Sequence, residues 1–284
     1  MTAAFGPGYA SAMIGVCSWS LQPHSPEELA HKVRQAGLSA IQIALDPLRI
    51  GDWNVDATLA ALHSAGIAIR SGMLRTCGED YTTLESIRQT GGVRPDEHWL
   101  ANIAAARENA RLARILGVNL VTFHAGFIPE QRGHAVRTLM IQRLREMIDC
   151  LGEHGVCAAF ETGQETAETL LDALAELDRP TVGVNFDPAN MLLYGMGDPV
   201  AALQRLAPRI KQVHLKDAIA SDTLGDWGRE TPLGRGQVDW PAFFRVLEAR
   251  NVRCDLMIER ESGGSRLDEI RAAANVARTA RHTE

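Results

Sequence analysis

The stretch VCAAFETGQETAETLLDALAELDRPTVGVNFD, residues 156–187, holds one complete unit of the pattern that runs through the sequence. A short apolar run ends near Glu161, an amphipathic segment covers residues 165–177, and a second apolar run ends at Asp187. Short apolar runs of this kind predict buried strands, and the longer amphipathic segment between them predicts a helix. Strands joined through a helix lie parallel, so the stretch predicts a parallel sheet that helices must cover.

The same alternation extends in both directions and gives eight apolar runs, at residues 13–19, 40–45, 67–72, 118–126, 156–162, 181–187, 210–217 and 255–261. Eight strand–helix repeats in 284 residues agree with the roughly 250-residue size of a (β/α)8 barrel. A doubly wound sheet is the alternative, but the turn after the first run reads SWSLQPHS and lacks a Gly-rich phosphate loop. No linker divides the chain. We therefore predict an α/β fold in which residues 1–284 form one domain, a single eight-stranded parallel TIM barrel.

Composition restricts the class of partner. Acidic residues outnumber basic ones 35 to 29, and the net charge of −6 argues against a nucleic-acid partner. No apolar run reaches the roughly 18–20 residues that span a bilayer, so no membrane partner is expected. The N-terminal stretch MTAAFGPGYASAMIG lacks the basic start and the long apolar segment of a signal peptide. The five scattered cysteines suit reduced thiols, and we predict a cytoplasmic protein.

Ionisable residues stand at the ends of the last five predicted strands. Strand 4 ends at His124, and strands 5 to 8 end at Glu161, Asp187, His214 and Glu259. Strand ends of a barrel meet at one open mouth, where three carboxylates repel each other unless they are protonated or share a cation. Three oxygens and one imidazole nitrogen form a suitable ligand set for one divalent ion, Mn²⁺ first, with Mg²⁺, Co²⁺ or Zn²⁺ as alternatives. Simpler explanations are that Asp187 caps a turn and that Glu259 pairs with Arg260 or Arg235.

Six short motifs, in order along the chain, resemble the xylose isomerase-like superfamily of sugar isomerases and epimerases. They are FHAG (123–126), FETG (160–163), NFDPANM (185–191), VHLKD (213–217), GRGQVDW (234–240) and IERE (258–261). The resemblance covers nearly the whole chain and implies a TIM barrel. In the ketose 3-epimerases of this superfamily a Glu, an Asp, a His and a Glu on strands 5 to 8 hold a divalent metal. By motif, these ligands correspond to Glu161, Asp187, His214 and Glu259.

Several departures limit what the resemblance implies about the substrate. Asn190 stands where endonuclease IV and many ketose epimerases have a histidine, and strand 3 ends in Arg70, Ser71 and Gly72 without one. The chain therefore lacks ligands for the three-zinc cluster of endonuclease IV. The acidic substrate contact that epimerases carry six residues after the first metal ligand falls here on Ala167. Hydroxypyruvate isomerases and inosose dehydratases belong to the same superfamily, so the identity of the substrate does not transfer.

The resemblance implies an enzyme that removes a proton next to the carbonyl of a sugar or polyol ketone through a metal-stabilised enediolate. Glu161 and Glu259 then act as base and acid, one on each side of the substrate. Return of the proton gives an isomerase or an epimerase, which is our first prediction. Loss of a β-hydroxyl instead gives a dehydratase acting on an inosose-like ring, and elimination of the glycosidic oxygen gives a lyase acting on a 3-keto-glycoside. A barrel that keeps only the fold is the third possibility.

Five further residues are substrate-binding candidates. Lys216 follows His214 by two positions and shares its side of the strand, although a salt bridge to Asp217 or Glu259 is the alternative. His124 is a hydrogen-bond donor candidate, with a supporting structural role as the alternative. Trp19 suits an apolar wall or core packing, Arg235 suits an anion contact or a glycine-flanked turn, and Asn190 follows the metal-ligand motif.

Two connections, residues 73–95 and 217–238, are long enough to act as lids or substrate walls. Asp217 points away from the mouth and is expected to cap the loop that follows it. We expect a small sugar or polyol as the partner and allow for a homo-oligomer.

Overall fold

A computed structural model describes residues 12–223 and 225–282, so most of the N-terminal stretch considered for a signal peptide lies outside the described residues. Eight parallel strands close into a barrel in the order β1-β10-β7-β6-β5-β4-β3-β2. Each barrel strand pairs with the barrel strands before and after it in the sequence, and β10 closes the barrel on β1. The predicted α/β TIM barrel is confirmed. All eight predicted strands are present: β1 (Ile14–Cys17), β2 (Ala40–Ala44), β3 (Ala68–Met73), β4 (Leu120–Phe123), β5 (Cys157–Glu161), β6 (Gly183–Phe186), β7 (Ile210–Leu215) and β10 (Asp255–Ile258).

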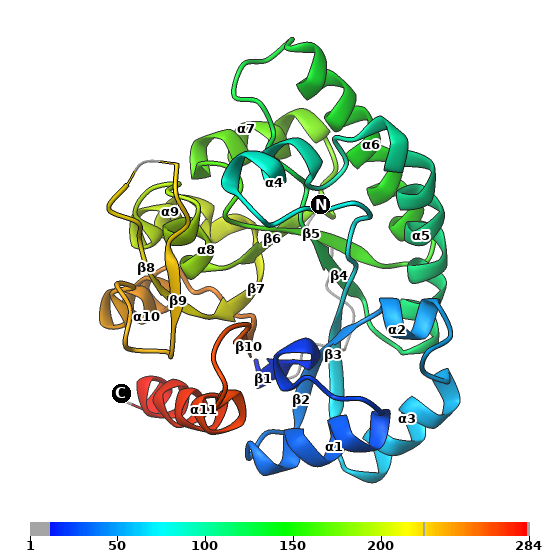
Figure 1. The fold of residues 1–284 in the computed structure, drawn as a ribbon, viewed down its shortest axis with the longest axis vertical. Coiled ribbons are helices and arrows are strands. Elements are labelled where there is room, and N and C mark those ends of the chain that lie inside the picture. The colour runs from blue at the N-terminus through cyan, green and yellow to red at the C-terminus, as the bar shows by residue number, and fades with distance from the viewer. Residues whose placement is uncertain (1–11, 224, 283–284) are drawn as a thin grey trace.

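Helices surround the barrel, as Figure 1 shows. The long ones follow the strands in alternation: α1 (Pro26–Gln35), α3 (Val55–Ser64), α5 (Asp96–Ile115), α6 (Ala135–Gly152), α7 (Ala167–Leu177), α9 (Pro199–Leu206), α10 (Trp240–Ala249) and α11 (Arg266–His282). Short helices lie in the connections: η1 (Ser18–Leu21), α2 (Asp46–Arg49), α4 (Leu84–Thr90), α8 (Pro188–Leu193) and η2 (Ala207–Arg209). Among the described residues, no helix is both long and apolar enough to cross a membrane.

The core lies between the strands and the helices that cover them. Phe123 and Phe160 pair across β4 and β5 with ring centroids 5.3 Å apart, and Phe186 of β6 meets Phe243 of α10 at 5.9 Å. All four rings are fully buried. Apolar side chains on the outer face of the strands therefore fix the helices, while the register of neighbouring strands fixes the height at which each strand ends.

The connection between β3 and α5 forms a wall of the barrel mouth and carries α4. Leu84 and Ile87 of α4 belong to a small apolar cluster with Phe127 and Tyr194. Gly92 lets the connection approach the end of β4, since a Cβ at this position would lie 2.1 Å from the carbonyl oxygen of Ala125. Leu74 and Val93, near the two ends of this connection, belong to the barrel core, whereas residues 80–83 are exposed.

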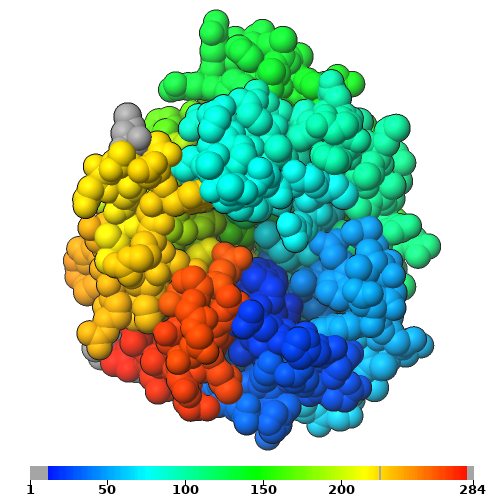
Figure 2. All heavy atoms as spheres, viewed as in Figure 1, coloured from blue at the N-terminus to red at the C-terminus, as the bar shows by residue number. Residues whose placement is uncertain are grey.

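The connection after β7 contains a hairpin that the sequence did not predict. Strands β8 (Asp217–Ile219) and β9 (Arg229–Thr231) pair antiparallel. Figure 2 shows a hollow at the centre of the face of the molecule that is turned to the viewer. The hollow is bordered by the cyan segment that includes α4, the yellow hairpin region, the orange segment after β10 and the dark blue segment after β1. The long connections therefore surround the strand ends where the ionisable residues were predicted.

Candidate metal centre

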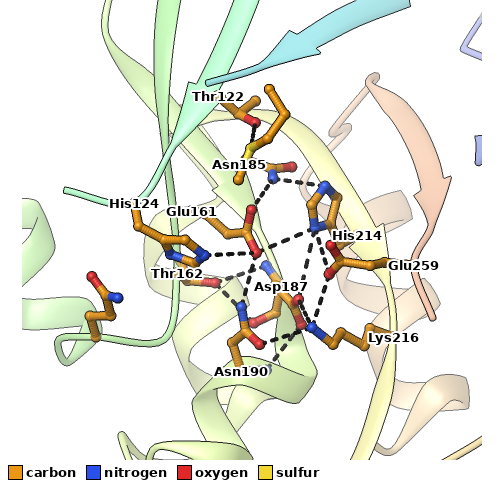
Figure 3. Close-up of polar contacts among 12 residues, drawn as sticks. Thr122, His124, Glu161, Thr162, Asn185, Asp187, Asn190, His214, Lys216 and Glu259 are labelled. Carbon is orange, nitrogen blue, oxygen red and sulfur yellow. Dashed lines mark hydrogen bonds and ion pairs between the residues drawn. The ribbon is translucent and has the colours of Figure 1, made fainter. Parts of the chain in front are cut away.

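Four buried side chains meet at the barrel mouth. Glu161 ends β5, Asp187 follows β6, His214 lies in β7 and Glu259 follows β10. One donor atom from each lies within 4.8 Å of the donor atoms of the other three. The imidazole is central, because His214 Nδ1 lies 3.2 Å from Glu259 Oε2, 3.5 Å from Glu161 Oε1 and 3.8 Å from Asp187 Oδ2 (Figure 3). The structure thus brings together the four residues that the sequence selected.

Two donor atoms of this cluster have no hydrogen-bond partner although they are buried. They are Asp187 Oδ2 and His214 Nδ1. The other oxygen of Asp187 caps α8, where it accepts hydrogen bonds from the backbone nitrogens of Ala189 at 2.8 Å and Asn190 at 3.0 Å. Asp187 is therefore both the predicted cap and a member of the cluster. Buried polar atoms are rarely left without partners, and the donor set of oxygens and one nitrogen fits a divalent cation.

The charges in the cluster are strongly coupled. Burial raises the pKa of Asp187 to about 6, against the opposing effects of Lys216 and His214. Burial alone would lower the pKa of His214, but the neighbouring Cys17, Glu161 and Glu259 outweigh it and hold that pKa well above its usual value. A positive charge on the imidazole therefore stabilises the carboxylates, and a cation among the same atoms would take over that role.

Lys216 lies beside the cluster and is also buried. Its Nζ donates to Glu259 Oε2 at 3.0 Å, to Glu261 Oε2 at 2.5 Å and to Asn190 Oδ1 at 3.3 Å. Lys216 therefore forms the predicted salt bridge with Glu259, whereas Asp217, the other predicted partner, has a different role. Glu261 was not selected from the sequence, although its place two residues after Glu259 puts it on the same side of the extended chain.

Hydrogen bonds also fix the orientation of the two glutamates. Trp19 Nε1 donates to Glu259 Oε1 at 2.8 Å, so the indole belongs to the mouth. Asn190 Nδ2 donates to Glu161 Oε1 at 2.9 Å, and His124 Nε2 lies 3.6 Å from the same oxygen. Three of the predicted substrate-binding residues, Trp19, Asn190 and His124, thus lie against the glutamates.

Asp217 organises the loop after β7, as predicted. Its carboxylate accepts hydrogen bonds from the backbone nitrogens of Ala218, Gly234, Gly236 and Val238 and from Trp240 Nε1. Arg235 sits exposed on the turn that these bonds hold. Arg260, the suggested partner of Glu259, pairs with Glu230 and Glu269 instead, so that alternative is wrong.

Polar side chains inside the barrel, directly below the cluster, were not predicted from the sequence. Gln42 Oε1 lies 2.7 Å from His214 Nε2, and Asn185 Nδ2 lies 3.2 Å from Glu161 Oε2. A sequence signal exists for both, because each is a single polar residue inside an otherwise apolar strand, AIQIA for β2 and GVNF for β6.

The chain belongs to the xylose isomerase-like TIM barrel family, whose model matches residues 28–280. Among curated proteins, it is 30% identical to an inosose dehydratase of Clostridium beijerinckii over 35% of this chain and 37% of that protein. It is 34% identical to the rhizopine catabolism protein MocC of Rhizobium meliloti over 42% of this chain and 41% of that protein. These matches span only about two fifths of the relatives' length.

Solved structures match over nearly the whole chain. A xylose isomerase domain protein from Planctomyces limnophilus has a TM-score of 0.87 and 26% identity, covering 95% of this chain and 97% of that one. A xylose isomerase-like TIM barrel protein from Mycobacterium smegmatis, solved in complex with magnesium, has a TM-score of 0.70 and 18% identity, covering 95% and 97%. The match to the Mycobacterium smegmatis protein shows only that the two proteins share a fold.

Proposed function

We propose that this protein is a divalent-metal-dependent enzyme that removes a proton next to the carbonyl of a sugar or polyol ketone, giving isomerisation or epimerisation. The observation that carries the proposal is the convergence of Glu161, Asp187, His214 and Glu259, with two buried donor atoms that lack partners. Family membership supports it, since relatives and structural neighbours bear the names of isomerases, epimerases and dehydratases.

The four residues would hold one cation, Mn²⁺ first and Mg²⁺, Co²⁺ or Zn²⁺ as alternatives. Carboxylate oxygens and one imidazole suit these ions, and the cluster offers no thiolate among its four members. A bound divalent cation supplies Lewis acidity for a carbonyl or hydroxyl oxygen of the substrate. A protein of the same fold, that of Mycobacterium smegmatis, was solved in complex with magnesium.

Glu259 is the proposed acceptor of the substrate proton, because it is ionised and lies at the barrel mouth. Burial alone would raise its pKa, but Lys216 and His214 outweigh burial and hold the pKa of this carboxyl well below its usual range. Glu259 is therefore ionised, and Trp19 and Lys216 fix its two oxygens. Glu161, whose Oε1 accepts a hydrogen bond from Asn190, is the proposed second acid–base group. It would exchange a proton with the substrate from the side opposite Glu259.

Dehydration is the second candidate, and two observations favour it. The curated relatives include inosose dehydratases and a 3-dehydroshikimate dehydratase of Bacillus anthracis, which is 29% identical over 43% of this chain. Lys216 adds a buried ammonium group 3.0 Å from Glu259. Loss of a β-hydroxyl requires one base and one proton donor, and Glu259 with Lys216 would supply that pair.

We propose that Lys216, His124, Asn190 and Trp19 contact the substrate, because all four side chains lie around the glutamates. Arg235 is kept as a candidate for an anionic substrate group. A cytoplasmic location is also proposed, and the absence of disulfide bonds among the described cysteines is consistent with it. A homo-oligomer stays a prediction, as does the absence of nucleic-acid and membrane partners.

Turnover in D₂O separates the two reactions. Metal-loaded protein is incubated with candidate ketoses and inososes, and the products are followed by NMR and mass spectrometry. An isomerase or epimerase incorporates deuterium into recovered sugar, whereas a dehydratase gives an unsaturated product 18 mass units lighter, counted without solvent deuterium. Glu259→Gln removes the proposed base, and Glu248→Gln on the exposed face of α10 is the matched control. Equal turnover of both variants would contradict the role of Glu259.

A further inference from the structure

Below the metal centre, the interior of the barrel is polar. Five fully buried polar side chains from five strands lie there: Gln42, Ser71, Thr122, Asn185 and Gln212. Uncharged polar side chains in a barrel interior cost free energy unless their hydrogen bonds are met. Here they bond to one another and to two residues of the metal centre. These hydrogen bonds connect the polar interior of the barrel to the metal centre, so the interior side chains can influence the metal ligands.

Gln42 contacts His214 on the ring nitrogen that faces away from the carboxylates. The distance between Gln42 Oε1 and His214 Nε2 is 2.7 Å. The amide of Gln42 is oriented from its other side, because Gln42 Nε2 donates to Thr122 Oγ1 at 2.7 Å. This leaves the carbonyl oxygen of Gln42 toward the imidazole, and a carbonyl oxygen accepts a hydrogen bond but cannot donate one.

No competing acceptor lies at this nitrogen among the described contacts. Asn185 Nδ2 lies 3.0 Å from His214 Nε2, but an amide nitrogen donates and does not accept, and one of its two hydrogens goes to Glu161 Oε2 at 3.2 Å. Only a bare Nε2 could accept the second hydrogen, and a bare Nε2 would set two acceptors against each other at the shorter contact, 2.7 Å from Gln42 Oε1. Cys17 Sγ lies 3.6 Å from Nε2 and itself donates to Gln42 Oε1 at 3.5 Å. Gln42 Oε1 is thus the acceptor that holds a proton on Nε2, so Nδ1, which faces the three carboxylates, is the nitrogen at which a cation would replace a proton.

The choice of nitrogen matters because the carboxylates of the metal centre lie on one side of the ring. On the Nδ1 side are Glu161, Asp187 and Glu259. On the Nε2 side the ring contacts uncharged groups, Gln42 Oε1, Asn185 Nδ2 and Cys17 Sγ. A proton on Nε2 therefore leaves Nδ1 as the nitrogen that can bind a cation among the carboxylates.

We propose that Gln42 is a positioning residue that keeps the proton of His214 on Nε2 and so commits Nδ1 to the cation. This inference rests on the proposed metal-dependent function. Gln42 itself does not touch the ion or the substrate. Partners of this kind orient metal-bound imidazoles, and their loss typically weakens metal binding about 10–100-fold.

The test compares Mn²⁺ affinity among metal-depleted variants, with free Mn²⁺ measured by electron paramagnetic resonance. Gln42→Met keeps the length of the side chain and removes the acceptor, so we expect binding about 10–100-fold weaker. Gln42→Glu restores an acceptor and should bind within about threefold of the natural protein. Gln212→Met is the matched control, because Gln212 is equally buried in the same interior and bonds to Asn185 and Ser71. It should also stay within about threefold.

Two results would overturn the inference: Gln42→Met binding within threefold of the natural protein, or Gln212→Met losing as much affinity as Gln42→Met. A second measurement decides the matter if Gln42→Met does not fold. Nitrogen NMR of the natural protein loaded with Mg²⁺ should show His214 Nε2 protonated, and a bare Nε2 would refute the proposal. If the natural protein binds neither ion, the proposed metal centre itself fails, which is a distinct outcome.

Discussion

Replacing Lys216 with methionine should destabilise the metal-free protein severely. The ammonium group is buried and lies 3.0 Å from Glu259 Oε2 and 3.8 Å from Asp187 Oδ2. Methionine retains most of the apolar stem but removes the positive charge. Glu259 and Asp187, which are 5% and 0% exposed, then lose a cation that balances them.

The size of the effect follows from breaking a buried ion pair, which costs about 3–5 kcal/mol of unfolding free energy. The entropy of unfolding is about 2.1 cal/mol/K per residue, or roughly 0.6 kcal/mol/K for this chain. The expected loss in Tm is therefore about 5–8 °C, measured by thermal denaturation after chelation of metals. Added Mn²⁺ should recover part of this loss, because the cation supplies positive charge to the same carboxylates.

Lys32→Met is the matched control. Lys32 pairs with Glu28 on the surface of α1, with side chains 25% and 34% exposed. Exposed pairs contribute about 0–1 kcal/mol, so this variant should lose less than about 2 °C. A metal-free Lys216→Met protein as stable as Lys32→Met would refute the description of Lys216 as the counter-charge of the cluster.

Three further predictions follow from the same contacts. Glu259→Gln should lower kcat by about 10²–10⁴ while circular dichroism stays unchanged; full turnover would exclude it as the base. Asp217→Ala removes the acceptor of five N–H groups. The free energy of unfolding should fall by about 3 kcal/mol or more, which is the net value of two hydrogen bonds to a charged group. Proteolysis within residues 220–238 should become faster, and an unchanged rate of proteolysis would contradict the role of Asp217. Because Lys216 and His214 hold the pKa of Glu259 below its usual 4.5 against the effect of burial, this carboxyl stabilises the metal-free fold above pH 4.5 and loses that effect as the pH falls. Denaturation at pH 3–6 should show a smaller loss in Glu259→Gln than in the natural protein, because Glu161 and Asp149, whose pKa values are also lowered, still titrate in the variant. Equal losses in the two proteins would contradict the contribution of Glu259.

The barrel and its four central residues were predictable because they depend on periodicity. Each strand of the pair around residues 156–187 ends in an acid, and parallel strands of similar length end at the same face. The strand–helix repeat alone therefore predicts which side chains converge at the barrel mouth. The same reasoning placed Asp217 away from the mouth, as its contacts with Gly234 and Trp240 confirm.

The rest depends on side-chain contacts that periodicity does not encode. Gln42 and Asn185 look like isolated polar residues in apolar strands, and only the closed barrel places them below His214 and Glu161. The hairpin β8–β9 lies in a stretch without an apolar run, and Arg229–Thr231 pairs there through backbone bonds. Arg260 was a plausible partner for Glu259 by proximity in sequence, but alternation along the chain turns it toward Glu230.

Crystals of the protein grown with Mn²⁺, with anomalous diffraction recorded at the manganese edge, test the central claim most directly. We predict one peak per chain at the barrel mouth, in contact with Glu161, Asp187, His214 Nδ1 and Glu259. An ion bound elsewhere, or a cluster that binds none at millimolar Mn²⁺, would contradict the account.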